Sequence, residues 1–360
     1  MKPSALHKLA ADAQQILQSN LQEVDGKLFA MPSKELYPAA WGWDTPQIAA
    51  GLYDQQPDQA LKLMEDFLSF QRADGMVPQI VFPALKPGER FDKDAYFPGP
   101  HVWYITDDTI QDYDTVRAQS FTEHPLYHET GGQSTGIPQY PIWALNLKQM
   151  HSKTPIPAER LAPLVEKLDA FHRYFHEQCD PEGLGIVAEM HPWLGCDNAP
   201  PYDAAMARIA DTASQAELQS IQRQRVDVES VVAAGGDISH RPTDRDYAAF
   251  LKIAHGIAAT DAKRAQGEAV STDDLPFVHY SPMLNGMLIR AEEDLAQLAF
   301  DAGLPDMATQ AKLDYECSKE EWQARLDLAA CYRIFDLLGW SESIYNHISV
   351  AVPGEEGAFL

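Results

Sequence analysis

The sequence predicts an all-α fold in which helix pairs are arranged as an α/α toroid. Apolar residues recur at spacings of three and four in about nine segments, whereas strand-like alternation is confined to short pieces at 77–82 and 101–105. The connections are alternately short and long, and the long ones, 83–136 and 183–202, are rich in Pro, Gly, His and Trp. Because long loops without secondary structure are uncommon and usually functional, we expect them to build a cleft on one face.

The predicted helices follow one another along most of the chain. The first spans 5–24, and the second, 45–53, is expected to have Thr45 as its N-cap and Pro46 as its first helical residue. The third, 58–70, ends at the polar turn 71–75. The others are expected at 138–150, 158–179, 203–212, 243–257, 282–302 and 318–338.

The charge of the chain excludes several classes of function. Its 360 residues include 53 acidic and 28 basic ones, a net charge of −25, which disfavours nucleic acid and anionic membrane surfaces as partners. No apolar stretch approaches the roughly 20 residues that span a bilayer, and the N-terminus has no signal-peptide core. The four cysteines show no CxxC pairing, so that reduced thiols are expected. These features predict a soluble, cytoplasmic protein.

The first segment with chemical potential is WGWD, residues 41–44, which precedes a predicted helix. The rings of Trp41 and Trp43 are suited to stacking on the apolar face of a sugar, and the carboxylate of Asp44 to accepting hydrogen bonds from its hydroxyls. The alternative is structural, with Asp44 as a helix cap and the tryptophans in the core.

A second segment, HPWLGCDNAPPYD at 191–203, is rich in turn residues and precedes another predicted helix. A carboxylic acid among Trp193, Pro200 and Tyr202 would be partly desolvated, which raises its pKa and keeps it protonated as a general acid. Alternatively, Asp197 belongs to an Asx turn and Asp203 is an N-cap.

A third segment, STGIPQYP at 134–141, contains Gln139 and Tyr140, whose side chains could hydrogen-bond sugar hydroxyls or merely begin a helix. His172 and His176 are four residues apart, but no HExxH motif or third ligand accompanies them, and neither they nor the other histidine groups, His124/His128 and His279, predict a metal site. The sequence has no GxGxxG loop, no phosphate-binding GxxxxGK[ST] loop and no GxSxG elbow. No cofactor is predicted.

Six segments in this order resemble the mannosylglycerate and glucosylglycerate hydrolase group of the family 63-like glycosidases. They are WGWD at 41–44, QRADGMVPQ at 71–79, STGIPQYP at 134–141, HPWLGCDNAPPYD at 191–203, RPTDRDY at 241–247 and NGMLIRAEEDLAQLA at 285–299. The resemblance covers about residues 1–305. It implies an (α/α)6 toroid that hydrolyses a small α-glycoside with inversion.

The resemblance also implies roles for individual residues. Asp197 matches the general acid of the family's DN(S/A)P motif, and Trp41, Trp43 and Asp44 match its sugar-subsite motif. Further residues fall in matching cleft segments: Gln139, Trp193, Asn198 and Tyr202. A small carbohydrate is therefore the expected substrate. Apart from the resemblance, an anionic substrate such as glucosylglycerate would need a local cationic clamp. Arg241, Arg245 and Arg290 are candidates for it, and each could equally be a surface or core-edge residue.

Two departures from the family pattern concern the chemistry. Leu194-Gly195-Cys196 replaces the usual Glu-Ser-Gly, which removes one carboxylate from this region. The late segment that carries the family's general base is also missing, and an inverting mechanism needs that second carboxylate. Glu189 and Asp203 are the nearest alternatives along the sequence.

The C-terminal part has a different character. The segment 318–354, with YNHIS at 345–349, resembles the start of the class II aldolase/adducin head domain. We therefore expect a toroid at 1–305 that lacks its last hairpins, followed by a truncated α/β segment at 306–360, as in a fusion of two truncated frames. Apolar helix faces left exposed in such a toroid favour homo-oligomers.

Two other interpretations stay open at this point. The chain could be a catalytically impaired carbohydrate-binding remnant, or a protein that acts through its adducin-like tail. An aldolase or epimerase activity would require a metal, and the metal-binding residues of that family are not among those matched.

Overall fold

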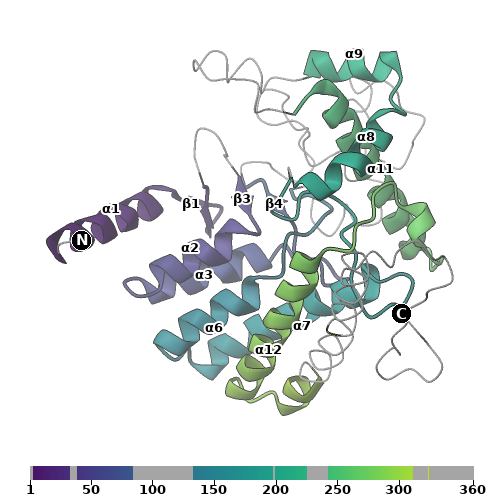
Figure 1. The fold of residues 1–360 in the computed structure, drawn as a ribbon. Helices are drawn as coiled ribbons and strands as arrows, with labels where there is room; N and C mark the ends of the chain where they lie inside the picture. Colours follow the sequence, from purple (N-terminus) through teal and green to yellow (C-terminus); the bar gives the residue numbers. More distant parts are fainter. Residues whose placement is uncertain are drawn as a thin grey trace, which may run out of the picture. The chain divides into compact units, whose positions relative to one another are not determined.

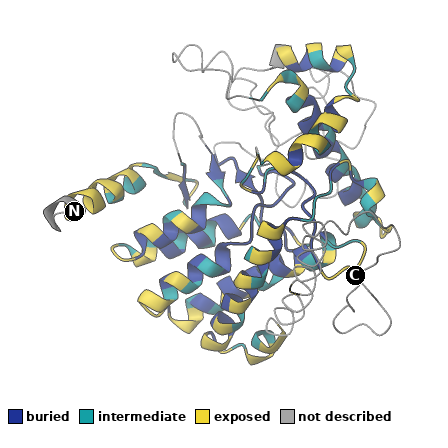
Figure 2. Cartoon of the chain, viewed as in Figure 1, coloured by how far each residue is buried: buried dark blue, intermediate teal, exposed yellow. Residues whose placement is uncertain are grey.

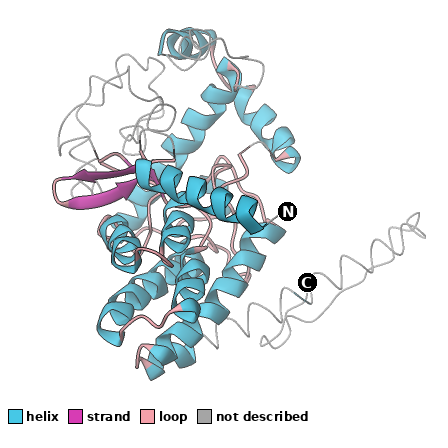
Figure 3. Ribbon diagram, turned by 90° about the vertical axis from the view of Figure 1, so that its left-hand side faces the viewer, coloured by secondary structure: helices cyan, strands magenta, loops and turns pink. Residues whose placement is uncertain are grey.

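The computed structural model describes residues 3–32, 39–83, 133–197, 199–224, 242–310 and Gln323. Among these residues helices dominate, and the strands are short (Figures 1 and 3). The chain divides into two compact units. The first contains residues 1–140, 149–155 and 189–279, and the second contains 141–148, 156–188 and 280–360. None of the helices in the described ranges is long and apolar enough to cross a membrane.

The first unit begins with helix α1 (Pro3–Ser19) and a β-hairpin of β1 (Leu21–Val24) and β2 (Lys27–Ala30), shown in magenta in Figure 3. The predicted helix over 5–24 is therefore wrong for its last residues. Asp25 and Gly26 occupy the turn with φ of 50° and 78°, which is the left-handed backbone that favours Asp-Gly in tight hairpins. The hairpin pairs Leu21 with Ala30 and Val24 with Lys27.

Helices α2 (Asp44–Leu52) and α3 (Pro57–Leu68) pack against each other in the same unit (Figure 1). Their buried residues lie on one side of each helix, as the dark blue and yellow faces in Figure 2 show. Thr45 is not the N-cap that we expected, because α2 begins one residue earlier, at Asp44. The Thr45 hydroxyl instead donates to the carbonyl of Trp41 (2.7 Å).

Three extended segments meet beside these helices. Strand β3 (Ala40–Trp41) pairs antiparallel with β4 (Ile80–Val81), and Val81 pairs in turn with Ser134. The predicted strand at 77–82 is thus present but short. This arrangement brings the WGWD segment, the 77–82 segment and the 134–141 segment into contact.

The rest of the first unit is helical. It contains the 3-10 turn η2 (Pro200–Tyr202), α8 (Asp203–Ala210), α9 (Gln215–Gln224), α11 (Asp244–Ala265) and the 3-10 turn η4 (Thr272–Asp274). Helix α11 packs on α8 and α9. Thr243 and Asp246 form a capping box at the start of α11. Helix α9 was not predicted, since it is rich in glutamine and presents few apolar residues.

The second unit contains α7 (Ala158–Gln178) and α12 (Pro282–Asp301), which lie side by side (Figure 1). Helix α6 (Trp143–Lys153) begins in this unit and ends in the first one. The side chain of Asn285, in α12, binds the backbone of Val187 twice, through Oδ1 (3.0 Å) and Nδ2 (2.9 Å). Both long helices were predicted to within about two residues at each end.

Several sequence predictions lie outside the described residues. These are the strand at 101–105, the histidines His124 and His128, the side chains of Asn198 and Arg241, and the aldolase-like segment except Gln323.

Candidate functional site

The predicted sugar-binding loop is fixed to the 134–141 segment by its own backbone. The amide N–H of Trp43 donates to Oε1 of Gln139 (2.7 Å), and the N–H of Gly42 donates to the carbonyl of Gln79 (2.7 Å). A Cβ atom at Gly42 would lie 2.7 Å from the carbonyl oxygen of Pro78, so that only glycine permits this close approach. Gln139 therefore holds the loop through its side-chain carbonyl.

The segment that carries Asp197 meets this loop at Gly195. The ring centroids of Trp43 and Tyr140 are 5.3 Å apart, and a Cβ atom at Gly195 would lie 3.1 Å from the Tyr140 ring and 3.5 Å from the Trp43 ring. Gly195 has a φ of 146°, which L side chains rarely adopt. The N–H of Tyr140 also donates to the carbonyl of Leu194 (3.2 Å). The three segments singled out in the sequence thus contact one another through residues of the first unit.

A buried carboxylate lies behind these contacts. Glu189 is 0% exposed and accepts the hydroxyl of Tyr140 through Oε1 (3.1 Å) and that of Tyr202 through Oε2 (2.7 Å). Burial, followed by the influence of Glu189, raises the pKa of both tyrosines, so that each hydroxyl keeps its proton and donates it. His279 pairs with Glu189 through the backbone (2.8 and 2.9 Å) and fixes its position.

Asp197 and Asp44 are the acidic residues that the sequence singles out for the acid and for sugar binding. Asp197 is exposed and lies in the turn that the N–H of Ala199 closes on the carbonyl of Cys196 (3.0 Å), whereas Asp44 is half-buried in the first turn of α2. The protein around each carboxyl removes part of its hydration and raises its pKa. A raised pKa is the property that a general acid needs at neutral pH.

Trp193 is held at the edge of the same segment. Its N–H donates to Nδ1 of His191 (3.1 Å), its ring makes an edge contact with Phe250 (4.9 Å between centroids), and Nε2 of Gln79 donates to its carbonyl (3.4 Å). Burial lowers the pKa of His191 to about 3, so that the ring is neutral at physiological pH and its Nδ1 is an acceptor. Trp193 itself is half-buried.

Two of the predicted site residues, Trp41 and Asp203, have positions that structural roles explain. Trp41 is half-buried and packs against the core cluster of Ala39, Ile80 and Phe82, in line with the structural alternative for this residue. Asp203 is the first residue of α8 and exposed, and it is not the N-cap.

Two of the three candidate cations have partners of their own. Arg245 pairs with Asp211, and Arg290 pairs with Glu293 and Asp294. Within the described residues no group of three His, Cys, Asp or Glu side chains is placed to hold a metal ion. His176 instead pairs with Glu292.

The role of Glu189 was missed by sequence reasoning, which considered it only as a general base. Tyr140 and Tyr202 are 49 and 13 positions away from it, and no spacing rule connects a loop glutamate with two distant tyrosines. The available signal was weaker. Glu189 lies in the apolar run 186–190, where burial of an unpaired carboxylate would be costly. Its position there therefore predicts that it has hydrogen-bond partners in the core.

Comparison with known proteins places the chain in a family. The mannosylglycerate hydrolase MGH1-like glycoside hydrolase domain matches residues 37–335. Mannosylglycerate hydrolase MGH2 of Selaginella moellendorffii is 31% identical over 326 residues, which cover 89% of this chain and 56% of that protein. The chain thus spans little more than half the length of this relative.

The likeness extends to the three-dimensional structure. The family 63 mannosylglycerate hydrolase of Thermus thermophilus, solved in complex with Tris and D-glycerate, matches with a TM-score of 0.60 and 25% identity over 87% of this chain and 64% of that one. The expected all-α fold class, of the α/α toroid type, is confirmed.

A second, short match is of another kind. An aldolase class 2 protein of Caulobacter vibrioides is 48% identical over 60 residues, 17% of this chain and 22% of that protein. The predicted resemblances to both families are confirmed. By the family match over 37–335, the chain belongs to the mannosylglycerate hydrolase MGH1-like glycoside hydrolases.

Proposed function

We propose that the protein hydrolyses a small α-glycoside such as mannosylglycerate or glucosylglycerate, with Asp197 as the general acid. The observation that carries the proposal is the contact of Gly195 with the rings of Trp43 and Tyr140, because it joins the sugar-binding segment to the segment of Asp197. Family membership and the D-glycerate bound by the Thermus enzyme support this class of substrate.

In this proposal each side chain has one task. Asp197 protonates the leaving oxygen, and its raised pKa keeps the proton in place until that step. Trp43, Trp41 and Trp193 contact the apolar face of the sugar, and Asp44 binds its hydroxyls. The remaining predicted binding residues are Gln139, Tyr140, Asn198 and Tyr202, of which both tyrosines act mainly by holding the site together.

The proposed mechanism also requires a carboxylate that activates water. A base in an inverting glycosidase faces the acid across roughly 6.5 to 9.5 Å, with room for a water molecule. Glu189 is poorly suited, because both of its oxygens accept tyrosine hydroxyls and it has no exposed surface. Asp203 is exposed and stays the better of the two residues considered from the sequence.

A second candidate function is carbohydrate binding without turnover, as expected of a catalytically impaired member of the family. The sequence Leu194-Gly195-Cys196 favours it, because it lacks the carboxylate that the family pattern has there, and Glu189 is too buried to replace that group. We further propose that residues 306–360 form a class II aldolase/adducin-like segment distinct from the glycosidase-like part at 1–305, which the short match supports.

Exposed apolar residues such as Leu9 and Ile16 on α1 support self-association into homo-oligomers.

The test is the release of glycerate and free sugar from mannosylglycerate and glucosylglycerate by the purified chain and its Asp197→Asn variant. The matched control is Asp211→Asn, an exposed acid of the same unit that pairs with Arg245 at the surface. We expect turnover that Asp197→Asn reduces by a factor of about 10² or more and Asp211→Asn leaves unchanged. Equal turnover in wild type and Asp197→Asn would refute the assignment of the acid.

Binding separates the two candidate functions. If the folded wild type shows no turnover, titration with the same glycosides, followed by tryptophan fluorescence, decides between them. A saturable signal that Trp43→Ala removes supports the binding function. The absence of both turnover and binding refutes the two together.

A further inference from the structure

We propose that Glu189 is a positioning residue whose buried carboxylate ties the turn that carries Asp197 to the segment that holds the sugar-binding loop. The inference rests on the proposed function, in which Asp197 and Trp43 act on one substrate.

The connection runs through two tyrosines that approach Glu189 from different segments. Tyr140 belongs to the 134–141 segment, and its ring contacts Trp43 at 5.3 Å between centroids. Tyr202 ends the 3-10 turn that follows Asp197, and its N–H donates to the carbonyl of Ala199 (3.0 Å). Each hydroxyl donates to a different oxygen of Glu189, at 3.1 and 2.7 Å. One carboxylate therefore holds both sides of the site.

The chemistry of the three groups makes this arrangement rigid. An ionised carboxylate is an acceptor only, and its two oxygens suit two phenol donors. Hydrogen bonds to a charged acceptor are among the stronger ones in proteins, and a buried carboxylate that loses them is penalised. The edge contacts of the Tyr202 ring with Phe277 (5.5 Å) and His279 (5.2 Å) leave that side chain little freedom to turn away.

The position of Glu189 within the backbone supports the same conclusion. Its N–H and carbonyl are both paired with His279, so that the carboxylate is fixed at its base by the two-way bridge and at its oxygens by the tyrosines. A general base, by contrast, needs an oxygen that can reach a water molecule. Because neither oxygen of Glu189 is exposed, the residue acts on the reaction through Tyr140 and Tyr202.

The experiment uses the full chain with Glu189→Gln, Tyr202→Phe and Tyr140→Phe. Glutamine keeps one acceptor oxygen and loses the other, and each phenylalanine removes one hydroxyl while keeping its ring. The matched control is Glu217→Gln, which alters a buried carboxylate of the same unit that accepts from Ser214 and Lys252. Circular dichroism below the melting temperature first establishes that each variant is folded.

Hydrogen exchange gives a readout that does not depend on activity. We expect faster exchange of the amides between 194 and 203 in Glu189→Gln and Tyr202→Phe, by a factor of about 10 for the loss of one net hydrogen bond, and unchanged exchange there in Glu217→Gln. Unchanged exchange in both site variants overturns the proposal, whether or not the wild type has activity.

Kinetics then distinguishes a positioning residue from a base. Misplacement of the acid by about 1 Å costs up to about 10²-fold, so that Tyr202→Phe should lower kcat with little change in KM. Tyr140→Phe, on the sugar side, should raise KM more than it lowers kcat. A Glu189→Gln variant that loses all turnover while exchange at 194–203 is unchanged identifies Glu189 as a base and overturns the positioning role. A wild type with neither turnover nor sugar binding refutes the proposed function, and the exchange result still decides the structural tie.

Discussion

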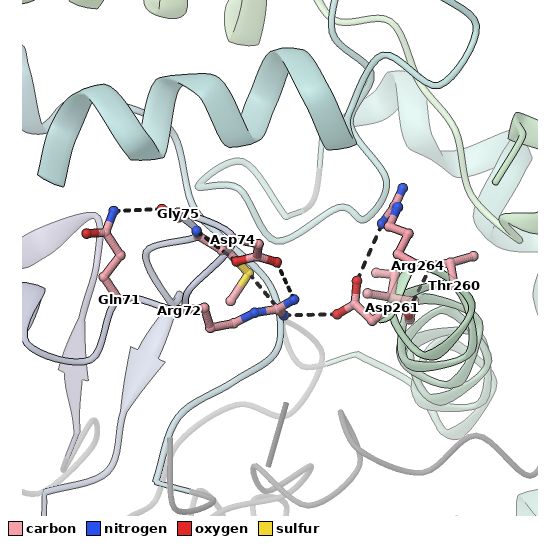
Figure 4. A network of polar contacts seen from close by, with 9 residues as sticks. Gln71, Arg72, Asp74, Gly75, Thr260, Asp261 and Arg264 are labelled. Carbon is pink, nitrogen blue, oxygen red and sulfur yellow. Dashed lines mark hydrogen bonds and ion pairs between the residues drawn. The ribbon is translucent and has the colours of Figure 1, made fainter. Parts of the chain in front are cut away.

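Arg72 and Asp261, which are 189 positions apart, form an ion pair of 2.9 Å in which the two side chains are only 3% and 5% exposed (Figure 4). Arg72 belongs to the QRADG turn after α3, and it also pairs with Asp74 of the same turn. Asp261 lies in α11 and accepts a second, longer contact from Arg264 (3.4 Å). This network connects the turn to α11 within the first unit.

We predict that Arg72→Met destabilises the protein by about 3 to 5 kcal/mol, because it removes the nearer cation from the buried carboxylate of Asp261 and leaves only the longer contact with Arg264. The measurement is the midpoint of urea unfolding with an unchanged slope. Lys153→Met is the control. It breaks the exposed pair with Asp54, whose side chains are 38% and 60% exposed, and should change stability by less than about 1 kcal/mol. Equal effects of the two substitutions would contradict the prediction.

Gly195→Ala should distort the candidate site. An alanine at this position would have to adopt the φ of 146°, and its methyl group would press on the rings of Tyr140 and Trp43. Backbone strain of this kind costs about 1 to 3 kcal/mol, and the displaced rings should change the near-ultraviolet circular dichroism. Gly183→Ala is the matched control, since Gly183 also has a positive φ (65°) but nothing within 4 Å of the added atom. An equal change of the near-ultraviolet circular dichroism in both variants would contradict the prediction that the methyl group displaces these rings.

The raised pKa of Asp197 predicts the form of the pH dependence. A general acid works only while protonated, so that kcat should fall as the pH rises through the pKa of this carboxyl. Asp197→Asn should remove that limb of the profile. A rate that keeps the same alkaline limb in Asp197→Asn would assign the limb to another group.

The same shift predicts a gain in stability for Asp197→Asn. Because desolvation raises the pKa in the folded state above the value in the unfolded state, the folded state binds more protons between the two values. Stability is therefore lost as the pH rises through this window. Asp197→Asn should melt at a higher temperature than the wild type at pH 7, with a smaller difference at pH 3.

Local sequence patterns determine the bounds of the long helices but not the structure of the segment 21–24. Helices α7 and α12 have long regular apolar spacing, α12 is capped by the Ser281 side chain, and the bounds of both were predicted closely. The segment 21–24 was misassigned because Leu21 and Val24 continue the helical spacing of α1, although Asp25-Gly26 is a hairpin signal. Pairing with β2 decides the structure of this segment, and no local spacing contains that information.

The candidate site also has features that the sequence predicts and others that it does not. The residue types of WGWD, GIPQY and HPWLGCD were sufficient to identify three segments with suitable chemistry, and the structure brings them together at Gly195. The joint role of Tyr140 and Tyr202 depends on a shared partner, Glu189, and such tertiary contacts between distant residues have no sequence period. The hydrogen bond from Trp43 to Gln139 is of the same kind.

His172, in α7, offers a test of the energetic cost of a buried polar group. Both of its ring nitrogens are buried without a hydrogen-bond partner among the described residues, and burial lowers its pKa to about 3. The unfolded state takes up a proton near pH 6.5 and the folded state does not, so that this residue removes stability as the pH falls from about 6.5 toward 3. We predict that His172→Phe raises the unfolding free energy by about 1 to 3 kcal/mol at pH 7, and by more at pH 5.

His191→Phe should lower the unfolding free energy at pH 7, because Nδ1 of His191 accepts the N–H of Trp193. Melting curves at the two pH values measure both effects, and a His172→Phe variant that is no more stable than the wild type at either pH would contradict the prediction.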